Sequence, residues 1–382
     1  MKLALVVHHA RPTGGQDRYV LELARGLAPR HDVHLVVVRA EGLDGAAVRV
    51  HELPIPDRPV LFLQPRFARA AAAVVARERF DLVHAVGGCL PGAGVVTAQY
   101  VHAAWRAARR RYRVRESPTP VHALYHHLVG RQAEAFDRRT YGHPALRAVI
   151  AVSRRTRDEL ARHYGLDTER VRVVPNGVDP ATFDRARWPG ARAELRGALG
   201  GLAGDAPVAL LIGTFARKGL DTAIAAVARA SGTAHLVVAG TGDADWANRV
   251  ARSCGFAGRL HLLGPRRDVA ALCAAADVFL LPTRYEPFGM VVAEAMAASL
   301  PVVVAGSAGA AEYVRHGENG FVVEQADDVD GFAAALRAIL TDRSRAEAVG
   351  RAARETAGAL AWPLVVAQTE AVYRLAAGGT AA

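Results

Sequence analysis

Two glutamates, Glu286 and Glu294, are separated by seven residues in the stretch YEPFGMVVAEA. Pro287 and Gly289 interrupt the strand that precedes them, and residues 291–298 have the composition of a buried helix beginning at about Gly289. A glutamate inside such an apolar helix is costly to bury without a partner. The spacing therefore predicts a helix N-terminus flanked by two carboxylates.

This helix start has the chemistry of a nucleotide site. Backbone amides at Gly289, Met290 and Val291, following Phe288, would point at a phosphate, because helix N-termini attract anions. Glu294 lies on the second turn, about 6 Å further along the axis, where a carboxylate can hold ribose hydroxyls. The alternative is a structural glutamate paired with an arginine.

A second candidate is the turn GTFARKGL, in which Arg217 and Lys218 follow a buried strand. The chain has 48 basic residues, and only Lys2 and Lys218 are lysines. A lysine retained next to a glycine at such a turn indicates a need for a compact ammonium, which the planar arginine head does not provide. Chance survival of one lysine is the competing explanation.

Gly14 and Gly15 form a third strand-to-helix junction, in TGGQD after the first strand. Paired glycines let the backbone approach a ligand closely, and a helix N-terminus follows. The full G-x-G-x-x-G spacing is missing, so an ordinary tight turn is an equal alternative.

We expect no metal at these sites. Asp243-Ala244-Asp245 spells a D-x-D but opens a predicted helix, where acidic residues are common. The three cysteines lie far apart, which argues against a disulfide framework and fits a reducing compartment. His122 and His126 have helical spacing but no third ligand nearby in sequence, so a surface helix is expected there.

The elements that position these residues alternate between short apolar strands and longer helices, twice over. Continuously apolar strands are typical of a parallel sheet buried on both faces. The expected strands are 3–9, 33–38, 82–86, 95–100, 149–152, 171–174, 208–212, 236–239, 260–262, 278–281, 302–305 and 321–323. The expected N-terminal helices are 16–27, 67–78, 122–141 and 154–164, with Ser153 as N-cap of the last.

This alternation predicts an α/β protein of two doubly wound, Rossmann-like domains. A stretch rich in Pro, Gly and Asp, residues 175–205, is expected to carry the break between them. We assign residues 1–185 to an N-terminal domain, 186–361 to a C-terminal domain, and 362–382 to a helix that crosses back to the first. Ligands of such sheets bind beyond the carboxyl ends of the strands, so we expect a cleft between the domains to hold the site.

The excess of positive over negative charge is confined to the first half. Residues 1–185 hold 29 Lys+Arg and 18 Asp+Glu, a balance of +11, and the remaining 19 and 19 cancel. Six arginines fall within Arg106–Arg115, flanked by Trp105 and with Tyr112 inside. A solvated loop, an anionic membrane contact and a nucleic-acid patch compete as explanations, and the aromatic residues favour the membrane over nucleic acid. No stretch reaches the ~20 apolar residues of a membrane span, and the N-terminus reads as a first strand, so we expect a cytoplasmic protein.

Several segments, which occur in the same order along the chain as in the family, resemble the retaining GT-B glycosyltransferases of family four. They are YEPFGMVVAEAMA, VVPNGVD (residues 173–179), AVSRRTRDEL (151–160), the Gly14-Gly15 loop and RKGLD (217–221). The resemblance covers nearly the whole chain. Within the family, the TFARKG form and the short connection are most similar to lipopolysaccharide-core glucosyltransferases.

The resemblance implies a role for each site residue. Arg217 and Lys218 would neutralise the donor diphosphate as it leaves, Glu294 would hold the ribose, and Glu286 would meet the sugar or orient the acceptor. His102, in QYVHAAW, matches the family's histidine near the transferred sugar; from the sequence alone it could equally be a structural histidine. The family commonly has an arginine at the position of Thr214, so Arg217 is expected to replace it.

The expected reaction is transfer of a hexose, with retention, from a nucleotide-diphosphate sugar to a cell-envelope glycan or lipid-linked acceptor, without a cofactor. The alternatives are a nucleotide-sugar epimerase, a phosphorylase, or a non-catalytic adaptor that binds membrane or nucleic acid through the basic half. A phosphorylase would need a Schiff-base lysine, for which Lys218 is misplaced. The base and sugar of the donor are not encoded in any motif that we can interpret.

Overall fold

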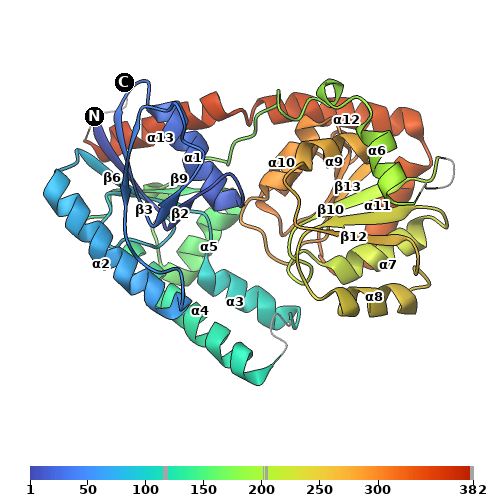
Figure 1. The fold of residues 1–382 in the computed structure, drawn as a ribbon, viewed down its shortest axis with the longest axis horizontal. Helices are drawn as coiled ribbons and strands as arrows, with labels where there is room; N and C mark the ends of the chain where they lie inside the picture. The colour runs from blue at the N-terminus through green and yellow to red at the C-terminus, as the bar shows by residue number, and fades with distance from the viewer. Residues whose placement is uncertain (115–118, 201, 203–204, 379–382) are drawn as a thin grey trace. The chain divides into compact units, whose positions relative to one another are not determined.

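The computed structural model describes residues 1–114, 119–200, 202 and 205–378. It divides into two compact units (Figure 1). The N-terminal unit contains residues 1–111, 115–176 and 362–382, and the C-terminal unit contains residues 112–114 and 177–361. The division falls at Asn176–Gly177, earlier than the sequence-based boundary at 185, and the last helix is grouped with the N-terminal unit.

The N-terminal unit is built on a seven-stranded parallel sheet in the order β5-β3-β1-β6-β7-β8-β9. Its strands are β1 (Lys2–Val6), β3 (Asp32–Val37), β5 (Val48–Glu52), β6 (Leu82–Val86), β7 (Val95–Ala98), β8 (Ala148–Ala151) and β9 (Val171–Val173). Two short strands, β2 (His9–Ala10) and β4 (Arg39–Ala40), pair separately. The α-helices described in this unit are α1 (Gly15–Leu27), α2 (Val60–Glu78), α3 (His102–Arg111), α4 (Pro120–Tyr141), α5 (Arg154–Tyr164) and α13 (Trp362–Ala376).

The C-terminal unit repeats this architecture with six parallel strands in the order β12-β11-β10-β13-β14-β15. The strands are β10 (Val208–Ile212), β11 (His235–Ala239), β12 (Leu260–Gly264), β13 (Val278–Leu281), β14 (Val302–Ala305) and β15 (Phe321–Val323). Its helices are α6 (Ala191–Ala198), α7 (Leu220–Ala230), α8 (Ala244–Ser253), α9 (Val269–Ala275), α10 (Met290–Ala297), α11 (Val329–Leu340) and α12 (Arg343–Gly358).

Both sheets are parallel, and their central strands are mainly apolar. In the central strands β10 and β13 every residue is buried, as expected where helices cover both faces. Strand order reverses between β1 and β6 in the first sheet and between β10 and β13 in the second. Ligands of doubly wound sheets bind at the carboxyl ends of strands at this reversal. The fold therefore marks the residues that follow β1 and β10, with their neighbouring strands, as candidate sites.

Several sequence-based assignments were wrong. Strand β5 was missed because its residues are mostly exposed, so no apolar run marks it. The arginine-rich segment forms helix α3 as far as Arg111, instead of the loop considered first; Arg115 lies outside the described residues. Residues 175–205 contain helix α6 in addition to the connection. Helix α2 begins at Val60, seven residues before the predicted start at residue 67, and Pro65 lies inside it.

Among the residues that the structure describes, none of the helices is long and apolar enough to cross a membrane.

Candidate functional site

Two cations and one carboxylate meet in the C-terminal unit. Arg217 and Lys218 lie in the turn between β10 and α7, and Glu286 lies in the loop between β13 and α10. The Lys218 ammonium and the Arg217 guanidinium both donate to Oε2 of Glu286, the latter at 3.2 Å. Arg217 also donates to the carbonyl of Tyr285 at 3.3 Å. Because β10 and β13 are neighbours at the strand reversal, this cluster occupies the position that the fold favours for a ligand.

Burial and charge act against each other in this cluster. Lys218 is only 5% exposed, and burial lowers the pKa of its ammonium against the attraction of Glu286. Burial opposes ionisation of Glu286 most strongly, but Lys218 and Arg217 together still lower the pKa of its carboxyl. Glu286 is therefore ionised at neutral pH, and it balances one of the two adjacent positive charges.

Glycine at position 213 allows Lys218 to lie where it does. Its φ of 128° is one that residues with a side chain rarely adopt. A Cβ on Gly213 would lie 2.6 Å from Cε of Lys218. A Cβ on the neighbouring Gly240 would lie 1.9 Å from the Gly213 carbonyl oxygen. The ends of β10 and β11 are thus packed backbone to backbone, with Lys218 folded across Gly213.

The loop that carries Glu286 is fixed by a second segment. The amide of Gly309 donates to the Glu286 carbonyl at 2.9 Å, and the amide of Ala310 donates to the Phe288 carbonyl at 2.7 Å. Phe288 is buried and packs edge-on against Tyr313. The loop is therefore held rigidly ahead of helix α10.

Helix α10 begins where the sequence predicted. Gly289 is its N-cap, with a φ of 97° and no side-chain capping bond. The amides of a first helical turn have no acceptor within the helix, so Met290 and Val291 can offer theirs to an anion. Glu294 is 2% exposed, inside a helix that is otherwise apolar. The described loop and helix thus place Phe288 through Glu294 on one continuous rigid segment next to the cluster.

In the N-terminal unit, His102 begins α3 after β7 and is oriented by a carboxylate. Its Nδ1 lies 2.8 Å from Oδ2 of Asp137, which is fully buried on α4. The backbone amide of His102 and the hydroxyl of Tyr164 both donate to the same Oδ2. A histidine held through Nδ1 presents Nε2 outward. Asp137 and Tyr164 come from two other helices, α4 and α5, and no local motif in the sequence marks them as site residues.

Gly14 and Gly15 follow β2 at the start of α1, in the same unit as His102. Gly14 is the N-cap of α1, with a φ of 93°, and a Cβ there would meet nothing within 4 Å. Asp17 in the first turn is bound by Arg11 at 2.8 Å. The space beside Gly14 is compatible with a ligand that approaches the backbone, and the glycine is required for its conformation, not to avoid a clash.

The D-x-D sequence is a helix start, as predicted. Asp243 is the N-cap of α8, and its Oδ1 accepts from the amide of Trp246 at 2.8 Å. The structure thus gathers Arg217, Lys218, Glu286 and the α10 segment into one cluster of the C-terminal unit. Gly14, Gly15 and His102 belong to the N-terminal unit.

Known families match both units. Residues 13–182 match the family described as "Glycosyltransferase Family 4", and residues 199–356 match "Glycosyl transferases group 1". A D-inositol 3-phosphate glycosyltransferase of Xylanimonas cellulosilytica is 30% identical over 391 residues, covering 94% of this chain and 91% of that protein. The chain belongs to glycosyltransferase family four. It spans about half the length of other curated relatives that it matches.

Solved structures show the same fold. WaaG, described as a glycosyltransferase involved in lipopolysaccharide biosynthesis, superposes with a TM-score of 0.78 at 24% identity, covering 97% of this chain and 98% of that one. HepE of Anabaena, solved with UDP-glucose, gives a TM-score of 0.71 at 20% identity, with 98% of each chain covered. The two units therefore have the GT-B fold.

Proposed function

We propose that the protein transfers a hexose from a nucleotide-diphosphate sugar to an acceptor, with retention of anomeric configuration and without a metal. The observation that carries this proposal is the convergence of Arg217 and Lys218 on Glu286 beside the start of α10. Two cations next to a helix N-terminus suit a diphosphate, which needs charge neutralisation as it leaves the sugar. The two side chains supply the positive charge that a divalent metal supplies in other transferases.

The cluster also suggests how the cations are kept in place before the donor arrives. Glu286 now accepts from both Arg217 and Lys218. When the diphosphate binds, the cations gain a second anionic partner, and one Glu286 oxygen becomes available for sugar hydroxyls. Preorganised charge of this kind typically contributes about 3–4 kcal/mol to the transition state for each donor.

Glu294 and His102 complete the proposed assignment. A carboxylate on the second turn of α10 can accept both ribose hydroxyls, and the apolar helix around Glu294 strengthens those bonds by excluding water. His102, with its ring fixed by Asp137, can donate or accept at the transferred sugar through Nε2. Gly14 and Gly15 permit close approach of a ligand at the start of α1.

The acceptor is proposed to be a cell-envelope glycan or a lipid-linked sugar. WaaG is described as acting in lipopolysaccharide biosynthesis, and HepE was solved with UDP-glucose. The likeness to HepE supports a sugar-nucleotide donor for this chain, and the likeness to WaaG supports an envelope acceptor. A nucleotide-sugar epimerase is less well supported, because the family to which the chain belongs is one of glycosyltransferases.

The product's anomeric proton tests the reaction. The purified protein is incubated in EDTA with UDP-, GDP-, ADP- and dTDP-hexoses and an envelope lipid extract, and nucleoside diphosphate release identifies the donor. NMR of the product made from that donor should show that the transferred sugar has the same anomeric configuration as it had in the donor. Inversion would overturn the retaining assignment, and activity only with added Mg²⁺ or Mn²⁺ would overturn metal independence.

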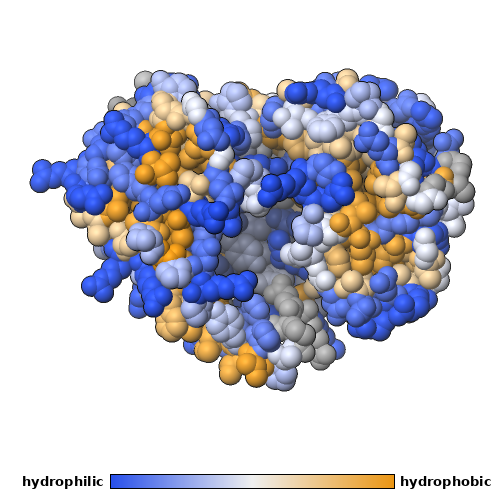
Figure 2. All heavy atoms as spheres, in the orientation of Figure 1, coloured by the Kyte–Doolittle hydropathy of each residue, from blue (hydrophilic) through white to orange (hydrophobic). Residues whose placement is uncertain are grey.

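Because a lipid-linked acceptor would lie at a membrane, we also propose that the N-terminal unit binds a membrane surface. Arg110 and Arg111 are exposed at the end of α3, which packs against α4. On α4, Val121, Leu124 and Leu128 form an exposed apolar row, at 77%, 60% and 46% exposure. These positions share one helix face. Apolar surface is visible around the outer end of α4 (Figure 2). Basic and apolar side chains together suit an anionic lipid surface, as on the inner face of a cytoplasmic membrane.

Vesicle co-sedimentation tests this contact. We expect binding to phosphatidylglycerol-containing vesicles, weak binding to pure phosphatidylcholine, and loss of binding in Arg110→Gln/Arg111→Gln and in Leu124→Ser/Leu128→Ser. Arg249→Gln/Arg343→Gln, at exposed arginines of the C-terminal unit, is the matched control and should bind normally. Equal binding by all these variants would overturn the assignment.

A further inference from the structure

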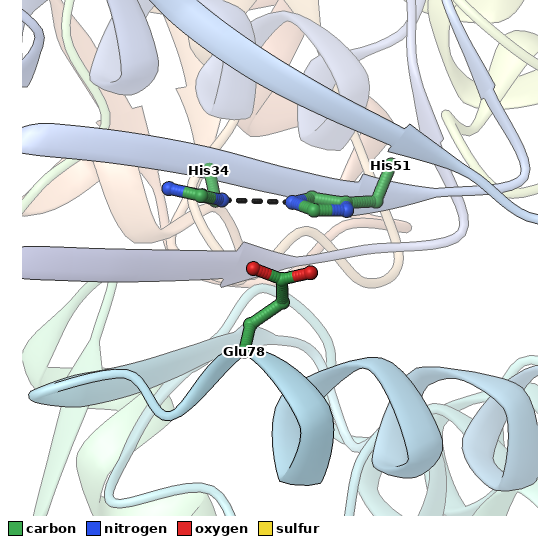
Figure 3. A group of neighbouring side chains, drawn as sticks. All are labelled: His34, His51 and Glu78. Carbon is green, nitrogen blue, oxygen red and sulfur yellow. Dashed lines mark hydrogen bonds between the residues drawn. The ribbon is translucent and has the colours of Figure 1, made fainter.

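A cluster of two histidines and a glutamate lies in the N-terminal unit, away from the donor residues. His34 is on β3, His51 is on the edge strand β5, and Glu78 is the last residue of α2 (Figure 3). One ligand atom from each lies within 4.8 Å of the others. Nδ1 of His34 and Nε2 of His51 are 2.7 Å apart, with the two rings stacked. Imidazole nitrogens and a carboxylate oxygen are ligands that Zn²⁺ commonly takes.

The surroundings resemble the outer shell of a metal site. Nε2 of His34 lies 3.5 Å from Oδ1 of Asp32 and 3.4 Å from the Arg49 guanidinium, which lies 3.5 Å from the other oxygen of that carboxylate. A metal-binding histidine usually gives its second ring nitrogen to a carboxylate, which fixes the ring and raises its basicity. His34 is almost fully buried, whereas Glu78 is partly exposed and leaves a route for an ion.

Lys2 is the main opposing charge, and its position is compatible with a bound ion. Its ammonium donates to the backbone carbonyl of Glu78 at 2.6 Å and lies 3.3 Å from Oε2. The carbonyl contact can hold the ammonium while a carboxylate oxygen turns to a metal. Arg77 contacts Oε1 of the same carboxylate at 3.2 Å. Both cations would weaken metal binding, so the affinity should rise when one is removed.

The second unit contains a matching pair that lacks the carboxylate. His235 and His261 lie on β11 and β12, the strands that correspond to β3 and β5 in sheet order. In each pair the second histidine is opposite the residue two positions after the first, namely Val36 for His51 and Val237 for His261. The nitrogens of His235 and His261 are 2.9 Å apart, again with stacked rings. Within the described chain, no His, Cys, Asp or Glu completes a metal cluster there.

We propose that His34, His51 and Glu78 bind a divalent transition metal of the Zn²⁺ class. His34 lies near the amino end of β3, and Glu78 ends the helix that leads into β6, so these two ligands lie away from the residues that follow the carboxyl end of β1. Its role is therefore structural: the ion ties the edge strand β5 and the end of α2 to β3. The third and fourth coordination positions would be completed by Glu78 and by water.

Cobalt and zinc titrations of the full-length, chelator-treated protein test the site. We expect one equivalent of Co²⁺ to bind with visible absorption bands of a tetrahedral nitrogen–oxygen site, and Zn²⁺ to displace it. His51→Asn and Glu78→Gln should each weaken binding at least tenfold, and Lys2→Met should strengthen it. His261→Asn, which removes a histidine from the matching pair, should bind like the wild type.

Folding is checked separately by circular dichroism and melting in EDTA, where all four variants should remain folded. Zn²⁺ should raise the melting temperature of the wild type and of His261→Asn, but not of His51→Asn. Absence of stoichiometric Co²⁺ and Zn²⁺ binding to the wild type would overturn the proposal. So would equal binding by His51→Asn and His261→Asn.

Discussion

The two units share one topology but differ in what stands at the ends of their strands. In the C-terminal unit, the turn after β10 brings Arg217 and Lys218 onto Glu286. In the N-terminal unit, the segment that leads into α1 carries Gly14 and Gly15 with the ion pair Arg11–Asp17, and Asp137 holds the ring of His102. We propose that the fixed charges of the second unit bind the phosphates, and that the glycines and the oriented histidine of the first unit face the sugar. The proposed difference in binding thus comes from the turns at the strand ends, where the two units carry different residues.

The units should also differ in their response to acid, which is the largest effect that we expect. Burial lowers the pKa of His84 in the N-terminal unit to about 3, and Tyr373 and Thr97 each contact its ring at 2.7 Å. In the unfolded chain this histidine titrates near 6.5. Between these values only the unfolded state takes up the proton, so stability is lost as pH falls from 6.5 toward 3, by about 5 kcal/mol in all.

Urea unfolding at several pH values measures this difference. Trp105 and Trp362 report on the N-terminal unit, and Trp188 and Trp246 report on the C-terminal unit, so variants that keep one pair separate the two signals. The N-terminal signal should lose stability first below pH 6, and His84→Gln should flatten its pH dependence. A C-terminal unit that unfolds first in acid would contradict the comparison.

Removing the buried lysine should have the next largest effect. Lys218→Met takes away a cation proposed to face the leaving diphosphate, so kcat/KM should fall about 10²–10³-fold. Lys2→Met removes the other lysine of the chain and should leave steady-state kinetics unchanged. Steady-state assays with the identified donor make the measurement, and equal kinetics for both variants would exclude Lys218 from the donor site.

The smallest effect is expected in the N-terminal unit. Asp137→Asn loosens the hold on His102, and misplacement of a group by about 1 Å can cost about 100-fold in rate. We expect kcat to fall by up to that factor, while the dissociation constant of the free nucleotide stays the same, since the residues proposed to bind the phosphates are in the other unit. A weaker nucleotide affinity in Asp137→Asn would contradict the proposal that only the C-terminal unit binds the nucleotide.

The sequence was sufficient where signals are local. Strands β10, β13, β14 and β15 were predicted at their observed bounds because each is a short, continuously apolar run. The start of α10 followed from Gly289, whose left-handed conformation stops the preceding segment.

What the sequence missed depends on long-range packing. Asp137 reaches His102 from the far end of α4, and His34, His51 and Glu78 come from two strands and a helix. No spacing rule connects such residues, because only the sheet order brings them together. Helix α3 was obscured by its arginines, whose charge suggested a solvated segment although its first residues, Ala103 and Ala104, are buried.

Donor binding to the wild type and to Glu294→Ala tests the central claim most directly. Titration calorimetry in EDTA, with the four nucleotide-hexoses in turn, should show one donor binding to the wild type and none to Glu294→Ala, while circular dichroism shows both proteins folded. A donor present at 100 times its dissociation constant should also stabilise the wild type by about 2.7 kcal/mol. If no nucleotide-sugar binds, or if Glu294→Ala binds as tightly as the wild type, the donor site proposed at α10 is contradicted.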